Sequence, residues 1–212
     1  MKILNLYAGI GGNRKHWGNH HHITAVEYDP VIAQAYTDHF PNDTVIIGDA
    51  LEYVLKHYHE YDFIWASPPC PTHSQYRYNV GVRAKGYDPV IPDMTSLYGL
   101  IIFLKHHFDG AYVVENVRPY YEPLLSPQKI GRHYVWSNFA IPPIKIPSTM
   151  IRNKNKISEL EESLGYDLFS YRMKNKRQVL RNCVEPEVGM HIFDAFLGTR
   201  MECYEIQESE NR

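Results

Sequence analysis

The chain has 212 residues, of which 44% are hydrophobic and 22% are charged. This composition is typical of a globular domain and excludes disordered and collagen-like proteins. The apolar runs are too short to span a bilayer and the first residues lack the pattern of a signal peptide, so we expect a cytoplasmic protein with no membrane partner. The formal charge of −2 hides a basic segment: residues 145–181 hold nine Lys and Arg against four Asp and Glu, a net charge of +5. This segment is a candidate phosphate-facing surface, with a solvated face as the alternative.

Short apolar runs that end at glycine or acidic residues recur along the chain. Residues 2–7 followed by Gly9-Ile10-Gly11-Gly12 predict a strand, a tight loop and the start of a helix. Residues 23–27 predict a second strand, and Asp29-Pro30 is typical of a helix N-terminus. The remaining expected strands are 45–47, 63–66, 111–114 and 132–139, and the remaining expected helices are 51–58, 96–108 and 182–197.

This alternation predicts an α/β fold with a mostly parallel sheet and helices on both of its faces. In such sheets, ligands bind beyond the carboxyl ends of the strands, where the glycine loop and the acidic residues fall. The polar stretch 71–95 is longer than most loops in compact domains, so we expect it to be a loop that acts as a lid.

The first two strand ends are typical of a nucleotide site, because a glycine turn admits a ligand and an acidic residue can accept from both ribose hydroxyls. Arg14 stands where the third glycine of the dinucleotide fingerprint is expected, so a single adenosine-type cofactor fits better than NAD. Asp49 is a candidate partner of the adenine amino group or a helix cap, and Tyr28 is a candidate for stacking on the adenine ring. The candidate cofactor residues from this pattern are Gly9, Gly11, Gly12, Glu27, Tyr28 and Asp49.

Cys70 lies just past a predicted strand, in the turn Ser67-Pro68-Pro69-Cys70-Pro71. A structural cysteine more often lies inside an apolar run, so this position favours a nucleophile. Glu115, at the end of another predicted strand, is a candidate acid partner of Cys70 or a loop cap, and Arg132 supplies a fixed cation.

Seven motifs, taken in order, resemble those of the DNA cytosine-5 methyltransferase family over nearly the whole chain. They are 6–12 (LYAGIGG), 26–29 (VEYD), 48–50 (GDA), 67–70 (SPPC), 115–117 (ENV), 128–132 (QKIGR) and 182–184 (NCV). The resemblance implies a Rossmann-like fold that binds S-adenosyl-L-methionine. At the matching positions, it places Tyr7, Gly9 and Gly11 around the cofactor, Glu27 at its ribose, Asp49 at its adenine and Asn182 close by.

The resemblance also implies the reaction. Cys70 would attack carbon 6 of a cytosine flipped out of DNA, which makes carbon 5 reactive toward the methyl group. Glu115 would hold nitrogen 3 and the exocyclic amine, and Arg132 would bind the 2-oxo group. Loss of the carbon-5 proton would then expel Cys70. Such an enzyme would work in the cytoplasm, at the nucleoid of a prokaryotic or virally infected cell.

The chain departs from the family pattern in places that concern the DNA. Pro71 stands where glutamine usually follows the nucleophile, and Ile130 replaces the first arginine of Gln-x-Arg-x-Arg. We expect three segments: 1–139 as the catalytic and cofactor-binding core, 140–181 as a minimal DNA-recognition insertion, and 182–212 returning to the core. The candidate DNA-binding residues are Arg77, Arg83, Lys85, Arg152, Lys154, Lys174 and Arg177.

The short insertion suggests an orphan enzyme of phage or prophage type, with a second copy or a helper protein as a candidate source of recognition surface. Three other interpretations stay open: an amino methyltransferase, an RNA cytosine methyltransferase, and a catalytically degenerate protein that binds DNA or a partner. The cysteines lack a CxxC pair and the histidines 20–22 are adjacent, so no metal site is expected.

Overall fold

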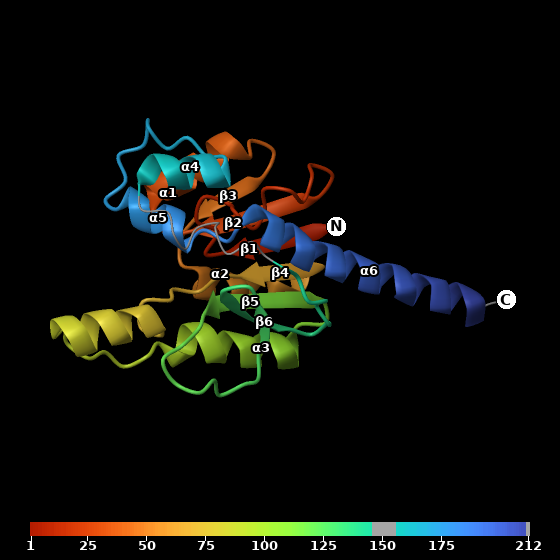
Figure 1. The fold of residues 1–212 in the computed structure, drawn as a ribbon. Coiled ribbons are helices and arrows are strands. Elements are labelled where there is room, and N and C mark those ends of the chain that lie inside the picture. The colour runs from red at the N-terminus through yellow and green to blue at the C-terminus, as the bar shows by residue number, and fades with distance from the viewer. Residues whose placement is uncertain (146–155, 211–212) are drawn as a thin grey trace.

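The computed structural model describes residues 1–145 and 156–210, with residues 200–210 described by their backbone alone. A seven-stranded sheet forms its centre (Figure 1). The strands are β1 (Lys2–Leu6), β2 (His22–Glu27), β3 (Thr44–Ile47), β4 (Phe63–Ala66), β5 (Ala111–Val117), β6 (Gln128–Ile130) and β7 (His133–Ser137). Their order in the sheet is β3-β2-β1-β4-β5-β7-β6. The first five strands in this order are parallel, and β7 runs antiparallel to β5 and β6, which confirms the predicted mostly parallel sheet.

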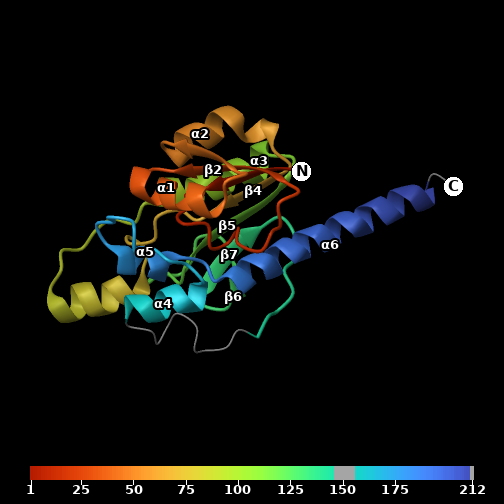
Figure 2. The same ribbon diagram turned by 90° about the horizontal axis from the view of Figure 1, so that it is seen from above.

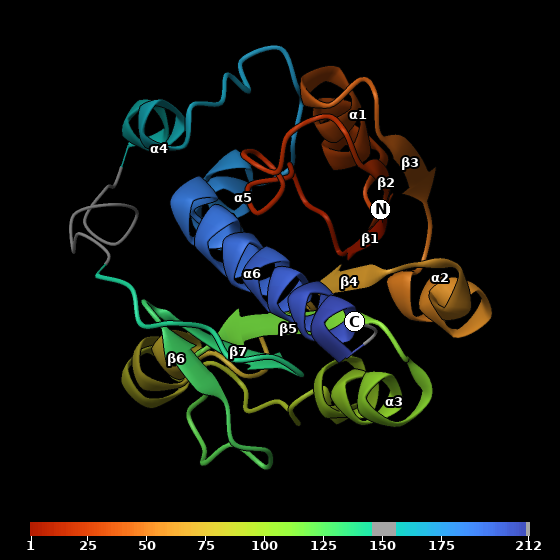
Figure 3. The same cartoon turned by 90° about the vertical axis from the view of Figure 1, so that its right-hand side faces the viewer.

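Helices cover both faces of the sheet (Figure 3). Successive strand residues point to opposite faces, and because these strands are apolar on both faces, each face is buried in its own core. Leu4 and Ile64 face a core that also contains residues of α2, η3 and α3. Ile3 and Phe63 face the other core, against α6, and α1 covers the neighbouring part of that face. The helical segments are α1 (Pro30–His39), α2 (Ala50–His57), η1 (Tyr58–Glu60), η2 (Arg77–Ala84), η3 (Thr95–Gly99), α3 (Leu100–His107), α4 (Ile157–Leu164), α5 (Lys176–Asn182) and α6 (Pro186–Glu210). Within the described residues, none of these helices is both long and apolar enough to cross a membrane.

The start of α1 follows the predicted capping pattern. Asp29 Oδ1 accepts hydrogen bonds from the backbone amides of Val31 and Ile32, at 2.8 and 3.2 Å. Pro30 occupies the first helical position, where its missing N–H costs no hydrogen bond. The cap therefore fixes the direction of the chain as it leaves β2.

The helix predicted after the glycine loop is wrong, because residues 8–21 form successive turns. The backbone of α6 lies directly against these turns: a Cβ on Gly189 would be 2.3 Å from the Asn13 carbonyl oxygen. The Trp17 indole donates to the Gly189 carbonyl at 3.3 Å, and Arg14 forms a buried two-pronged ion pair with Asp43 at 2.9 and 3.0 Å. Long-range packing thus outweighs the local signal for a helix.

The segment 71–95 is not an irregular loop throughout, since it contains η2 and the start of η3. Its two ends are tied together, because the Asp93 amide donates to Thr72 Oγ1 at 3.0 Å and His73 Nε2 lies 3.1 Å from the Asp93 carbonyl oxygen. Between these ties, η2 projects from the body of the protein (Figures 1 and 2). Its action as a lid stays a prediction.

Candidate active site

A cleft of about 850 Å³ opens beyond the carboxyl ends of the parallel strands. Its volume lies within the range of small-molecule sites. The predicted nucleophile and the predicted cofactor residues line this same cleft. This agrees with the expectation that ligands of an open α/β sheet bind beyond the carboxyl ends of its strands. The predicted residues that line it are Tyr7, Gly9, Gly12, Glu27, Tyr28, Asp49, Cys70, Lys174 and Asn182.

Backbone hydrogen bonds fix the carboxylate of Glu27 in the cleft, beside Gly9. Glu27 Oε2 accepts from the Gly9 amide at 2.9 Å, and Oε1 accepts from the Asp29 amide at 3.0 Å. Each carboxylate oxygen keeps a further lone pair, which suits it to accept from a diol. Gly9 has a φ of +57°, and no atom lies within 4 Å of the position of an added Cβ. The backbone there is open to close approach by a ligand.

Tyr7 is the one described non-glycine residue with a positive φ, at +54°. This strained conformation occurs directly after β1, and such strain is typical of functional sites. The Tyr7 hydroxyl is buried near the Ser96 side chain but makes no hydrogen bond of normal geometry within the described residues. Burial raises the pKa of Tyr7 well above its usual range. Tyr7 thus combines a strained backbone with a position in the wall of the cleft.

The other predicted cofactor residues have different surroundings. Asp49 Oδ1 accepts from the Glu52 amide at 2.9 Å, so the helix-cap alternative is confirmed, while Asp49 also lines the cleft. Tyr28 is 76% exposed at the cleft and available for stacking. Gly11 does not line the cleft, since an added Cβ would meet the Phe40 ring at 2.3 Å.

Gly12 allows the C-terminal segment to reach the cleft. An added Cβ there would lie 2.1 Å from Cys183 Sγ and 2.4 Å from the Val184 carbonyl oxygen. Asn182, at the end of α5, is thereby brought to the cleft from the far end of the chain. Burial, followed by the charge of Glu185, raises the pKa of the Cys183 thiol to about 12, which fits a structural role for this cysteine.

Cys70 lies in the turn after β4, next to the end of β5. The parallel register pairs Ala66 with Val114, so Glu115 follows at the level of Ser67. Burial raises the pKa of the Cys70 thiol to about 11, and the Glu115 carboxylate acts in the same direction. In this state the thiol keeps its proton near neutral pH, so a nucleophilic role requires that proton to leave.

Glu115 lies in a buried row of alternating charges that residue spacing does not reveal. Its Oε1 contacts Nδ1 of His133, and His133 Nε2 lies 3.3 Å from Glu185 Oε2. Burial is the largest effect on Glu115 and opposes its ionised form, yet the charge and hydrogen bond of His133, the Ser67 side chain and the Arg132 charge together hold the pKa of the carboxyl below its ordinary value. His133 and Glu185 were not among the residues predicted from the sequence. Each is a polar residue that directly follows a motif, 128–132 or 182–184, and this position was the available signal.

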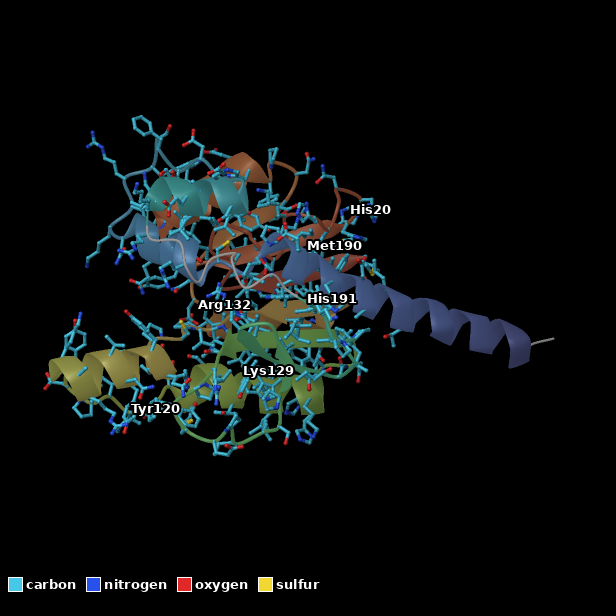
Figure 4. All side chains as sticks on the ribbon, viewed as in Figure 1. His20, Tyr120, Lys129, Arg132, Met190 and His191 are labelled. Atoms are coloured by element: carbon cyan, nitrogen blue, oxygen red, sulfur yellow. The ribbon has the colours of Figure 1, made fainter. Side chains whose placement is uncertain are left out.

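Arg132 completes this row from the hairpin between β6 and β7. Its guanidinium donates to Glu185 Oε1 at 2.9 Å and to the carbonyl oxygens of Arg181 and Cys183 at 3.2 and 2.9 Å. It is directed at the C-terminal segment, yet its charge still acts to lower the pKa of Cys70. Figure 4 shows Arg132 between α5 above and η2 below.

The candidate DNA-binding residues are spread over separate places. Arg77 and Arg83 lie on η2 and Lys85 follows it, whereas Lys174 lines the cleft. Arg177 lies on α5. Two further candidates, Arg152 and Lys154, lie outside the described residues. The described part of the basic segment also has a small core, in which Leu160 and Leu164 of α4 pack with Ile10 and with Ala35 of α1.

The strand order and the cleft define a Rossmann-like α/β fold, and the family match that follows makes it a methyltransferase that uses S-adenosylmethionine. Residues 1–119 match the family model of the C-5 cytosine-specific DNA methylases, and the chain belongs to this family.

Solved structures of other proteins resemble this chain. The Entamoeba histolytica methyltransferase EhMeth matches with a TM-score of 0.55 and 12% identity, over 94% of this chain and 98% of that chain, and shares the fold. A hypothetical protein of Thermus thermophilus matches with a TM-score of 0.44 and 15% identity, over 64% of this chain and 73% of that chain. A search of curated proteins gives no match.

Proposed function

We propose that this protein transfers the methyl group of S-adenosylmethionine to carbon 5 of cytosine in DNA, through a covalent bond between Cys70 Sγ and carbon 6 of a flipped base. One observation carries the proposal: Cys70 and the Glu115 carboxylate lie at adjacent strand ends, and Cys70 opens on the cleft that the cofactor residues line. A nucleophile and an acid partner at the rim of a cofactor cleft suit attack on a base held beside the methyl donor.

The cleft fits the cofactor in shape and in chemistry. Glu27, already held by two backbone amides, would accept from the ribose hydroxyls, and Asp49 would accept from the adenine amine. Tyr7 and Gly9 would border the ligand, and Asn182 would approach it from α5. When bound, S-adenosylmethionine supplies an electrophilic methyl group on its sulfonium.

The protein's own residues would divide the remaining work. Cys70 bonds to carbon 6 after its proton passes to solvent, and Glu115, protonated as the base binds, donates to nitrogen 3, where the electron pair displaced from the carbon 5–carbon 6 double bond is stabilised. Carbon 5 then bonds to the methyl group. Protonation of Glu115 removes the negative charge that adds to the effect of burial in raising the pKa of Cys70. Arg132 would bind the 2-oxo group through donors beyond those it gives to the C-terminal segment. Removal of the carbon-5 proton lets the Cys70–carbon-6 bond break and restores the aromatic ring.

DNA recognition is assigned by this proposal to residues 140–181 and to η2. Arg83 and Lys85 are exposed on and after η2, in the segment that follows Cys70 along the chain. Residues 1–139 would bind the cofactor and carry the chemistry, and residues 182–212 would return the chain to the core. A second copy or a helper protein would extend the recognition surface.

The test is methyl transfer from labelled S-adenosylmethionine to mixed genomic DNA, followed by nucleoside mass spectrometry. We expect 5-methylcytosine from the wild-type protein and none from Cys70→Ala, with cofactor binding retained in the variant. Methylation of an exocyclic nitrogen would contradict the proposal and favour an amino methyltransferase. Transfer to RNA alone, or cofactor binding with no transfer to any nucleic acid, would also overturn it.

A further inference from the structure

His133 and Glu115 lie on one face of the sheet although they come from strands of opposite direction. The antiparallel register of β5 and β7 pairs Glu115 with Val135 and Val117 with His133. Glu115 and His133 are therefore diagonal neighbours whose side chains point to the same side. Both are buried, at 5% and 2% exposure, so solvent does not screen their contact.

The two nitrogens of the His133 ring face two different carboxylates. Nδ1 contacts Glu115 Oε1, and Nε2 lies 3.3 Å from Glu185 Oε2. Ionised carboxylates accept hydrogen bonds and cannot donate them, whereas a neutral imidazole has only one N–H to give. Only the doubly protonated ring can donate to both partners, so the geometry itself indicates an imidazolium.

The far end of the row is also fixed. Glu185 Oε1 accepts from Arg132 Nε at 2.9 Å, which produces the order carboxylate, imidazolium, carboxylate, guanidinium. Adjacent charges in this row are opposite in sign, so no buried charge in it lacks a partner of opposite charge. Glu185 precedes α6, so the row links the chemical end of β5 to the segment that contacts Gly12.

We propose that His133 is the positioning residue of Glu115, which it holds through Oε1, with the Ser67 side chain as a further hydrogen-bond partner of the same carboxylate. This inference rests on the proposed function, because it assigns a support to the carboxylate that would contact cytosine. A carboxylate held by one oxygen cannot turn freely about its terminal bond, so its orientation is set before the base arrives. None of the seven motifs that carry the family resemblance includes this histidine.

The charge state agrees with this assignment. Burial is the largest effect and opposes the charged ring, but the charge and hydrogen bond of Glu115 and the hydrogen bond to Glu185 together raise the pKa of His133 above its ordinary value. The titratable and charged groups that face the pair come from every neighbouring element. They are Glu115 on β5, Arg132 on the β6–β7 hairpin, Glu185 before α6, and Cys70 and Cys183 near the two carboxylates.

Two substitutions at this position separate positioning from simple structural support. His133→Asn puts an amide nitrogen near the place of Nδ1 and can still donate to Glu115. His133→Gln puts it nearer the place of Nε2 and favours the contact with Glu185. We expect kcat to fall by about 100-fold in His133→Gln and by at most about tenfold in His133→Asn, with KM for S-adenosylmethionine unchanged in both.

A stability control accompanies them, because either variant disturbs a buried row. Val188→Ala removes buried volume from α6 on the same face of the sheet without touching Glu115. If the two histidine variants lose equal activity, or lose only what Val188→Ala loses at a matched melting temperature, His133 is a structural residue and the inference is overturned.

A spectroscopic measurement tests the contact without requiring turnover. The Nδ1 proton of His133 should give a far-downfield proton resonance, assigned by its absence from His133→Gln and displaced by Glu115→Gln. A resonance that Glu115→Gln leaves in place would contradict the inference. Because this readout needs no DNA, it stands even if the wild-type protein makes no 5-methylcytosine, so failure of the proposed function and failure of the positioning role are distinguishable.

Discussion

The Nδ2 amide of Asn116 donates a 3.0 Å hydrogen bond to the carbonyl oxygen of Pro68. Asn116 is buried on β5, and Pro68 lies two residues before Cys70 in the turn after β4. This contact joins the strand that carries Glu115 to the turn that carries Cys70. It therefore helps to fix the position of Cys70 relative to Glu115.

Asn116→Ala should release this turn. We expect kcat for methyl transfer to fall by about 100-fold with affinity for S-adenosylmethionine unchanged, because displacement of a reacting group by about 1 Å has an effect of that size. Asn138→Ala is the matched control, since the Asn138 side chain donates to the Gly110 carbonyl at 2.9 Å and accepts from the Tyr112 amide at 3.0 Å, near the other end of β5. Equal loss of turnover in both variants would show that Asn116 serves stability alone.

Glu27→Gln should weaken binding of the cofactor. The carboxylate accepts from the amides of Gly9 and Asp29, and glutamine offers only one acceptor oxygen and no charge. Loss of a charge-assisted hydrogen bond predicts a decrease in affinity of about 10- to 100-fold, measured by calorimetry with S-adenosylmethionine. Glu52→Gln, an exposed change on α2, should leave the affinity unaltered. Wild-type affinity in Glu27→Gln would remove Glu27 from the cofactor site.

DNA binding should weaken steeply with salt, and η2 should contribute to this dependence. Arg83 and Lys85 are exposed, and each phosphate contact contributes about 0.9 to the slope of log affinity against log salt concentration. Arg83→Gln with Lys85→Gln should lower the slope by about 2, measured by fluorescence anisotropy on a labelled duplex. Lys105→Gln, an exposed change on α3, is the control. An unchanged slope in the double variant would place the DNA elsewhere.

Glu185 should make the folded protein sensitive to acid. Burial opposes its ionised form, but the hydrogen bond from His133 and the charge of Arg132 outweigh burial and lower the pKa of Glu185 to about 2, from an ordinary value of 4.5. A depressed pKa stabilises the folded state above the ordinary value, and this contribution is lost as the pH falls toward 2. We expect the free energy of unfolding to fall by about 2 kcal/mol between neutral pH and pH 3, measured by urea unfolding, out of about 3 kcal/mol that is lost once the pH is below 2. Glu185→Gln should flatten this part of the profile relative to Glu187→Gln, an exposed neighbour, and parallel profiles would refute the assignment.

Local signals predicted the elements that position the cofactor cleft. Asp29-Pro30 and Asp49 act through capping, which needs only a few adjacent residues, and both helices begin as expected. The apolar run 63–66 matches β4 residue for residue, because a strand buried on both faces is apolar throughout.

Features that depend on distant parts of the chain were not predictable in the same way. The helix expected after Gly12 is absent since Gly189, far along the chain, packs against Asn13. The contact of Glu115 with His133 requires the antiparallel register of β5 and β7, which no local pattern specifies. The direction of Arg132 toward Glu185 likewise spans 53 residues of sequence.

Attack of Cys70 on carbon 6 of a cytosine in DNA is the step on which the proposed function depends. Fluorine at carbon 5 cannot leave as a proton does, so DNA that contains 5-fluorocytosine should trap the covalent intermediate when S-adenosylmethionine is present. We expect a denaturant-resistant protein–DNA complex whose linkage maps by mass spectrometry to the peptide that contains Cys70, and we expect no complex with Cys70→Ala. A linkage at another residue, or 5-methylcytosine made by Cys70→Ala at the wild-type rate, would contradict this account.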